Sequence, residues 1–121
     1  MENSAASAIL DLAVGIRRLS GDRDLYIQIM EIFFSQAEGQ LQTIRQALDA
    51  RNAEVVRRIS HGMKGAAANL GALRVQETAR QLEALGADED MENASPLVER
   101  LKRDVAELSD FWQAERAKTI E

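Results

Sequence analysis

The chain has 121 residues, enough for one domain with a single core, and its formal net charge is −5. It contains no cysteine and one histidine, which excludes disulfides, thiol catalysis and metal sites rich in Cys or His. The acidic balance argues against a dedicated nucleic-acid-binding protein, because phosphate backbones are bound by strongly basic surfaces. We therefore expect no cofactor, no metal ion and no nucleic-acid partner.

Two features of the sequence argue against membrane insertion and export. No apolar run approaches the roughly 18 residues of a membrane span. The first residues, MENSAAS, carry an acid and lack the basic n-region of an export signal. We therefore expect a cytoplasmic protein, and its abundant Ala, Leu, Glu, Gln and Arg favour helices over strands.

The first two helices are predicted from apolar residues at helical spacing. The SGD sequence at 20–22 ends the first helix, and either Asp22 or Ser20 caps the second, which covers about 22–50. Gly39 lies inside this second helix and weakens the prediction that it is unbroken. The expected apolar stripes are Ile9, Leu12, Ala13, Ile16 and Leu19, and then Leu25, Ile29, Ile32, Phe33, Ala37, Leu41, Ile44 and Leu48.

The third and fourth helices are predicted over about 53–70 and 72–85. Asn52 is a suitable N-cap for the third, and Gly71 stands where a left-handed C-terminal residue is needed. Gly86 is expected to end the fourth helix. Its expected inward residues are Val75, Ala79, Leu82 and Leu85.

The last helix is predicted to begin at Ser95-Pro96, a capping Ser followed by Pro at the first helical position. The preceding ADEDMENA sequence, residues 87–94, is expected to be an acidic, solvated loop. Short connections between long amphipathic helices favour antiparallel neighbours. We therefore predict one all-α domain over 1–121, an up-down antiparallel four-helix bundle with a short additional N-terminal helix. The apolar stripe expected in the last helix is Leu97, Leu101, Val105, Leu108 and Trp112.

The only histidine lies in residues 60–71, which read SHGMKGAAANLG. Successive helical residues are about 100° apart, so His61 falls about 200° from Ile59, opposite the expected core stripe. On the same face lie Lys64, Gly65 and Ala68, with Arg57 and Arg58 one turn earlier. A glycine inside a helix costs about 1 kcal/mol relative to Ala. Gly65 beside an exposed imidazole therefore indicates close approach by another molecule. The core stripe expected in this helix is Val56, Ile59, Met63, Ala66, Ala67 and Leu70.

These residues also carry a family resemblance. The segment HGMKGAAANLGA resembles the signature of histidine phosphotransfer (HPt) domains, with its His, Lys and Gly followed by small residues and Leu-Gly. The segment LSGDRDLYIQIMEIFFSQA resembles the family's second helix, and ALRVQETARQLEALG resembles the helix after the histidine. The similarity covers about residues 10–112.

The resemblance implies a phosphocarrier rather than an enzyme. His61 would accept a phosphoryl group from a receiver-domain aspartate and relay it to another receiver domain, while the partner supplies the metal and the catalytic carboxylates. Lys64 would neutralise the phosphoryl oxygens, Gly65 would give the partner access, and Glu83 could orient the imidazole. Many relatives have Ser after Lys-Gly, but Ala66 and Ala67 stand here, so no hydroxyl role is carried over to those positions.

The implied partners are receiver domains of response regulators and hybrid histidine kinases, bound by a monomer. We expect the contact to include Arg57, Arg58 and Ala68 around His61, and part of an apolar patch from the first helix. That patch comprises Ile9, Leu12 and Ile16. The same three residues could instead simply pack over the end of the bundle.

Two other functions remain open at this point. The chain could be the phosphoacceptor domain of a chemotaxis-type histidine kinase, although AAANLGA follows the pattern of relay modules more closely. It could also be a non-catalytic helical module that binds receivers or kinases. The presence of His61 together with Lys64 and Gly65 argues against the second alternative.

Overall fold

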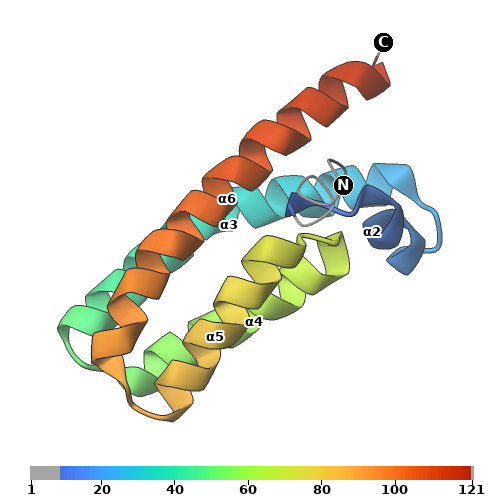
Figure 1. Ribbon diagram of the computed structural model, residues 1–121. Coiled ribbons are helices and arrows are strands. Elements are labelled where there is room, and N and C mark those ends of the chain that lie inside the picture. The colour runs from blue at the N-terminus through green and yellow to red at the C-terminus, as the bar shows by residue number, and fades with distance from the viewer. Residues whose placement is uncertain (1–8, 121) are drawn as a thin grey trace, which may run out of the picture.

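The computed structural model describes residues 9–120, apart from the side chains of the last two. These residues form five helices and no strand (Figure 1). Residues 1–8, which contain the whole MENSAAS segment used to argue against an export signal, lie outside the described residues. None of the five helices combines the length and apolar character that crossing a bilayer requires. The helices are α2 (Leu12–Arg18), α3 (Arg23–Asp49), α4 (Ala53–Leu70), α5 (Leu73–Ala87) and α6 (Met91–Ile120).

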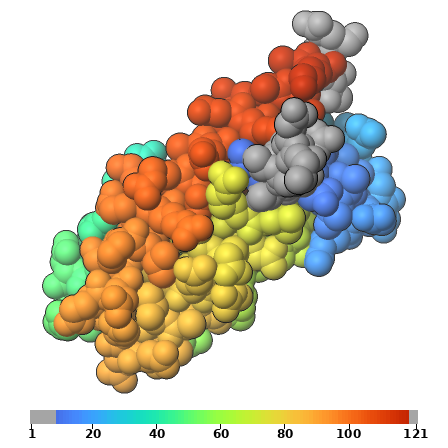
Figure 2. All heavy atoms as spheres, viewed as in Figure 1, coloured from blue at the N-terminus to red at the C-terminus, as the bar shows by residue number. Residues whose placement is uncertain are grey.

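The four long helices run up and down in an antiparallel bundle, with α4 beside α5 and with α3 and α6 completing the core (Figure 1). The short helix α2 lies at one end of the bundle, and Figure 2 shows it in blue beside the α4–α5 connection. The predicted fold class, a four-helix bundle with a short additional N-terminal helix, is therefore confirmed.

The predicted caps of α3 and α4 are confirmed. The Asp22 carboxylate accepts a hydrogen bond from the Leu25 backbone N–H at 3.0 Å, and the Asn52 side chain accepts one from Val55 at 3.3 Å. Gly71 ends α4 with φ of 77°, the left-handed conformation that glycine adopts without steric cost. These caps satisfy backbone donors and acceptors that have no partner inside the helix.

The predicted start of the last helix is wrong, because α6 begins at Met91 instead of Ser95. The Asp90 carboxylate accepts a hydrogen bond from the backbone N–H three residues later at 3.2 Å, which caps this earlier start. Met91 and Ala94 are buried. The second half of the segment expected to be a solvated loop therefore forms the first turn of α6 and packs into the core. Pro96 lies within the helix, where it cannot donate a backbone hydrogen bond.

Gly86 also differs from its prediction, since α5 continues to Ala87 and the glycine is buried inside the helix. A Cβ atom at position 86 would lie 2.8 Å from the backbone nitrogen of Arg57 in α4. This glycine therefore allows α4 and α5 to approach closely instead of ending α5. Gly39, by contrast, is exposed within an unbroken α3.

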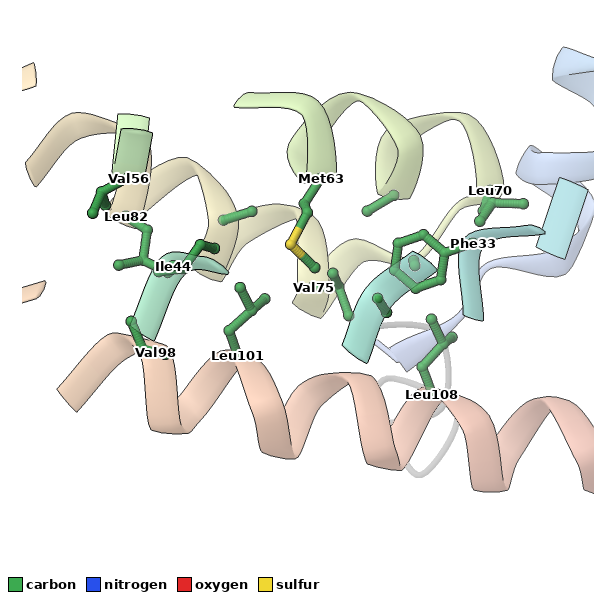
Figure 3. Packing of buried hydrophobic residues seen from close by; sticks show 14 of the residues in the cluster. Phe33, Ile44, Val56, Met63, Leu70, Val75, Leu82, Val98, Leu101 and Leu108 are labelled. Carbon is green, nitrogen blue, oxygen red and sulfur yellow. The ribbon is translucent and has the colours of Figure 1, made fainter. Parts of the chain in front are cut away.

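The core is formed by apolar side chains from all four long helices (Figure 3). The stripe predicted for α4 is largely right, but two residues predicted inward in α3 are exposed, Leu25 at 39% and Ile32 at 53%. Tyr26 and Met30 are buried instead, so the predicted inward face is wrong in the N-terminal part of α3. Farther along the helix it is right, since Phe33, Ala37, Ile44 and Leu48 are buried as predicted. The labelled core residues in Figure 3 are Phe33, Ile44, Val56, Met63, Leu70, Val75, Leu82, Val98, Leu101 and Leu108.

Polar contacts join the N-terminal segment and α3 to the C-terminal end of α4. The backbone N–H of Asp11, the N-cap of α2, donates to the carbonyl of Gly71 at 2.7 Å. The hydroxyl of Tyr26 in α3 donates to the carbonyl of Leu70 at 2.7 Å. The Asp11 carboxylate caps α2 by accepting from Val14. These contacts close one end of the bundle and leave the middle of α4 uncovered by α2.

Candidate functional site

His61 lies in the middle of α4 on its outer face. Its side chain is 64% exposed, whereas Val56 and Met63 on the opposite face are fully buried. The exposed position predicted from helical phase is therefore confirmed. An imidazole on a rigid helix with an open face is accessible to a partner protein without any rearrangement of the bundle.

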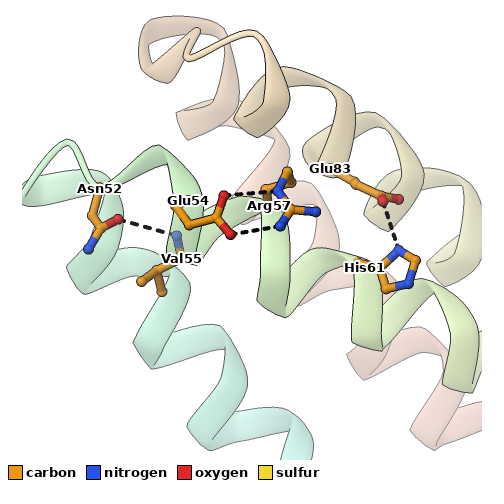
Figure 4. A network of polar contacts seen from close by, with 6 residues as sticks. All are labelled: Asn52, Glu54, Val55, Arg57, His61 and Glu83. Atoms are coloured by element: carbon orange, nitrogen blue, oxygen red, sulfur yellow. Dashed lines mark hydrogen bonds and ion pairs between the residues drawn. The ribbon is translucent and has the colours of Figure 1, made fainter.

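Glu83 of α5 contacts both His61 and Lys64. One carboxylate oxygen, Oε2, lies 2.8 Å from Nδ1 of His61 (Figure 4). The other, Oε1, lies 2.7 Å from Nζ of Lys64. The Glu83 side chain is only 21% exposed and that of Lys64 29%, so the packing of α4 against α5 holds both groups beside the ring.

The Glu83 carboxylate is charged at neutral pH. The hydrogen bond from Lys64 is the main cause that lowers the pKa of Glu83, partial burial opposes it, and the contact with His61 lowers the pKa further. A charged carboxylate only accepts hydrogen bonds, so Nδ1 of His61 must be the donor. In the neutral ring the lone pair is then on Nε2, on the far side of the ring from Glu83.

Arg57 lies one turn before His61 and is held by Glu54. Its guanidinium donates two hydrogen bonds to that carboxylate, at 3.0 and 2.7 Å (Figure 4). This pairing is the main cause that raises the pKa of Arg57, with a smaller contribution from Glu83. Arg58 is exposed. Within the described part of the chain, neither arginine hydrogen-bonds to His61, so both belong to its surroundings and not to its immediate contacts.

Two exposed glycines leave open space on the surface of α4 beside His61. At Gly65, a Cβ atom would have no described atom beyond its own stretch of helix within 4 Å. The same is true of Gly62, which sequence reasoning missed although it directly follows the histidine. Because neither glycine is required by packing inside the chain, both leave room for another molecule. Ala66 and Ala68 are half-buried beside them.

The apolar residues of the N-terminal segment are not brought together with His61. Ile9, Leu12 and Ile16 are half-buried and pack against the core. Helix α2 contacts the end of α4, where Gly15 lies directly against the Leu70 carbonyl and the Asp11 N–H reaches Gly71. Leu70 is nine residues after His61, which corresponds to roughly 13 Å along a helix. Their arrangement therefore favours the simple packing role.

A second residue that sequence reasoning missed is Ser60, directly before the histidine. It is fully buried, and its hydroxyl has no hydrogen-bond partner among residues 9–120. Ser60 directly follows Ile59 and so lies at the edge of the predicted core stripe. This helical phase is the signal from which its burial could have been predicted. Among the described residues, no three His, Cys, Asp or Glu side chains form a group that could hold a metal ion.

Comparisons with known proteins place this geometry in a family. The model of the Hpt domain matches residues 28–111, more than half of the chain. A search of curated proteins gave no match. Hpt domains are phosphocarriers that work with receiver domains.

Two solved structures have the same fold. The histidine-containing phosphotransfer protein B (HptB) of Pseudomonas aeruginosa PAO1 is 25% identical, with a TM-score of 0.82 over 91% of this chain and 96% of that one. The HPT domain of an Hpt sensor hybrid histidine kinase from Shewanella is 14% identical, with a TM-score of 0.76 over 89% and 94%, and shows the fold alone. The chain belongs to the Hpt domain family, and its function is histidine phosphotransfer in phosphorelays.

Proposed function

We propose that His61 is the phosphoacceptor of this domain. It accepts a phosphoryl group from the aspartyl phosphate of one receiver domain and passes it to the aspartate of another. The observation that carries this proposal is the 2.8 Å contact of Nδ1 with Glu83 on a ring that is 64% exposed. The contact leaves Nε2 as the accessible nucleophile (Figure 4).

The transfer step is a substitution at phosphorus. The Nε2 lone pair forms a bond to phosphorus while the bond from phosphorus to the aspartate oxygen breaks, and its electrons remain on the aspartate carboxylate. In this accepting step Nδ1 does not have to lose its proton, because the attacking nitrogen is Nε2. We assign the metal ion and the catalytic carboxylates to the receiver domain, as the family implies.

Three residues around His61 have supporting roles in this proposal. Glu83 orients the ring and selects its tautomer. Lys64, whose Nζ is held beside the ring by Glu83, turns toward the phosphoryl oxygens and neutralises part of their charge. Gly65 leaves space for the receiver's active-site rim, which the open surroundings of its Cβ position support.

We further propose that the receiver domains of response regulators and hybrid histidine kinases dock on the face of α4 around His61. Arg57, Arg58 and Ala68 would lie in the contact, and charged residues are common at the rim of such interfaces. Ile9, Leu12 and Ile16 would contribute at most an edge, since they are half-buried. A cytoplasmic monomer, with residues 1–121 acting as one domain, fits the acidic composition and the absence of membrane-spanning helices among residues 9–120.

The experiment compares phosphoryl donors. The protein is incubated either with a labelled phospho-receiver or with ATP and an isolated kinase catalytic domain of the chemotaxis type, and the label is then chased into a second receiver. We expect label from the receiver and its onward transfer. Efficient labelling by the kinase domain with no labelling by receivers would favour the chemotaxis-type alternative. Binding without any label would favour the non-catalytic module.

A further inference from the structure

Glu83 contacts Nδ1, the ring nitrogen opposite the one proposed to carry the phosphoryl group. We propose that in the phosphorylated protein this carboxylate holds the proton on Nδ1, and so keeps phospho-His61 in the form that donates its phosphoryl group. The inference rests on the proposed phosphorylation of His61. It adds a second task for Glu83, in the donating half of the relay, to the orientation of the ring in the accepting half.

The chemical reason lies in the leaving group. When the Nε2 lone pair forms its bond to phosphorus, a ring that already carries Nδ1–H becomes a cation. Donation breaks the phosphorus–nitrogen bond and returns its electrons to Nε2, while the receiver's aspartate oxygen forms the new bond to phosphorus. If Nδ1 is protonated, the departing group is neutral imidazole. If Nδ1 has lost its proton, the departing group is imidazolate, which is a much stronger base and a poorer leaving group.

The charges around the ring favour retention of the proton. Glu83 touches Nδ1 directly at 2.8 Å. Three cations of α4 also lie in this region: Lys64, bound to the other oxygen of Glu83 at 2.7 Å, Arg57, paired with Glu54, and the exposed Arg58. All three oppose a positive ring, but within the described residues none hydrogen-bonds to it.

Among the described residues, α2, α3 and α6 make no polar contact at this point. In the part of the chain that the structure describes, α2, α3 and α6 supply no hydrogen bond or ion pair to His61, Lys64 or Glu83. The nearest opposite charge therefore acts on Nδ1 without an intervening group. The lowered pKa of Glu83 agrees with a carboxylate that stays ionised beside the ring.

The test measures the protonation of phospho-His61 directly by phosphorus NMR as a function of pH. Wild-type protein is compared with Glu83→Gln, which keeps an acceptor oxygen but removes the charge. Glu77→Gln is the matched control, because Glu77 lies on the same helix, loses the same charge, and is paired with Arg80 at 2.6 Å instead of with the site. If Glu83→Gln accepts slowly from a receiver, phosphoramidate serves as the chemical donor for all three proteins.

We expect the titration midpoint to fall by about one pH unit in Glu83→Gln, as befits one partly exposed charged contact. It should not move in Glu77→Gln. Donation to a receiver domain should then be about tenfold slower than wild type near pH 8 and little changed near pH 6.

Two results would overturn the inference: the same midpoint in Glu83→Gln as in wild type, or donation slowed equally at both pH values, which indicates orientation alone. Failure of the proposed function looks different, because the wild-type protein would then give no phosphohistidine signal at all.

Discussion

Gly86 in α5 lies directly against the backbone of Arg57 in α4, where a Cβ atom at position 86 would stand 2.8 Å from the Arg57 nitrogen. Glu83 lies one turn from Gly86, and His61 lies one turn from Arg57. The two helices run antiparallel, so this close contact sets the distance across which Glu83 meets His61. The packing of two helices thus positions the two groups of the site.

Gly86→Ala is therefore expected to destabilise the bundle. The added methyl group meets backbone and Cβ atoms of Arg57, which cannot rotate away, and overpacking of this kind costs about 1–3 kcal/mol. Denaturant unfolding measures the change. The matched control is Gly39→Ala in α3, where an added Cβ atom would have open space, with no described atom beyond its own stretch of helix within 4 Å. Removal of this helical glycine should stabilise by about 0.5–1 kcal/mol. Equal effects of the two substitutions would show that α4 and α5 are not in close contact at Gly86.

Gly65→Gln is expected to separate stability from function. Replacement of this exposed helical glycine should raise the free energy of unfolding by a few tenths of a kcal/mol or more, up to about 1 kcal/mol. Transfer from a phosphorylated receiver should nonetheless slow, because the new side chain occupies the open surface beside His61. Gly39→Gln, at an exposed position of α3, should give the same stabilisation with normal transfer. Wild-type transfer by Gly65→Gln would rule out steric access as the reason for the glycine.

Two substitutions of Lys64 test whether its positive charge stabilises the phosphoryl group on His61. A phosphoryl group brings nearly two negative charges to the ring, and Lys64 is the only cation that shares a hydrogen-bonding partner with His61 among the described residues. Lys64→Ala should weaken phosphorylation or shorten the lifetime of phospho-His61 by about 1–2 kcal/mol, roughly tenfold. Lys64→Arg should retain much of the function because the charge persists. Phosphohistidine decay and transfer rates decide the matter: if Ala and Arg behave alike, the cation is not what stabilises the phosphoryl group.

Asp104 gives a pH dependence of stability unrelated to phosphotransfer. It is buried and accepts a hydrogen bond from Thr78 at 2.5 Å. Burial is the main cause that raises the pKa of Asp104, although the Thr78 hydrogen bond opposes it. The folded state thus prefers the protonated carboxyl, so this stabilisation is present at low pH and is lost as pH rises through the folded-state pKa. Asp104→Asn should be more stable than wild type at neutral pH, and the difference should shrink or reverse on acidification.

Urea unfolding of both proteins across acidic and neutral pH measures this difference. A stability difference that is constant with pH would contradict the expected titration of Asp104.

Much of the fold could be predicted because local signals agreed with the packing. In α4, a single apolar stripe, the Asn52 cap and the left-handed Gly71 all mark the same helix, and the phase then places His61 outside. The start of α6 could not be predicted in this way. Pro96 is a strong local signal, but burial of Met91 and the cap by Asp90 outweigh it.

The site shows the same division between local and tertiary information. The exposure of His61 follows from the sequence of one helix, whereas the simultaneous contact of Glu83 with His61 and Lys64 depends on how closely α5 packs on α4. That distance is determined by Gly86, whose sequence context favoured a helix end. In α3, two apolar stripes overlap near the N-terminal end, one through Ile32 and one through Tyr26 and Met30. Tertiary packing buries the second stripe and leaves Ile32 53% exposed.

The most direct measurement of the central proposal is phosphoryl transfer to His61→Gln. Because the chain contains one histidine, any phosphohistidine must be at that residue. Wild type and His61→Gln are incubated with the same labelled phospho-receiver, and circular dichroism confirms that both retain the helical bundle. We predict that the wild-type protein gains the label and that His61→Gln gains none while its helix content and unfolding temperature stay close to wild type. Label retained on His61→Gln at the wild-type level would contradict the assignment of His61 as the phosphoacceptor.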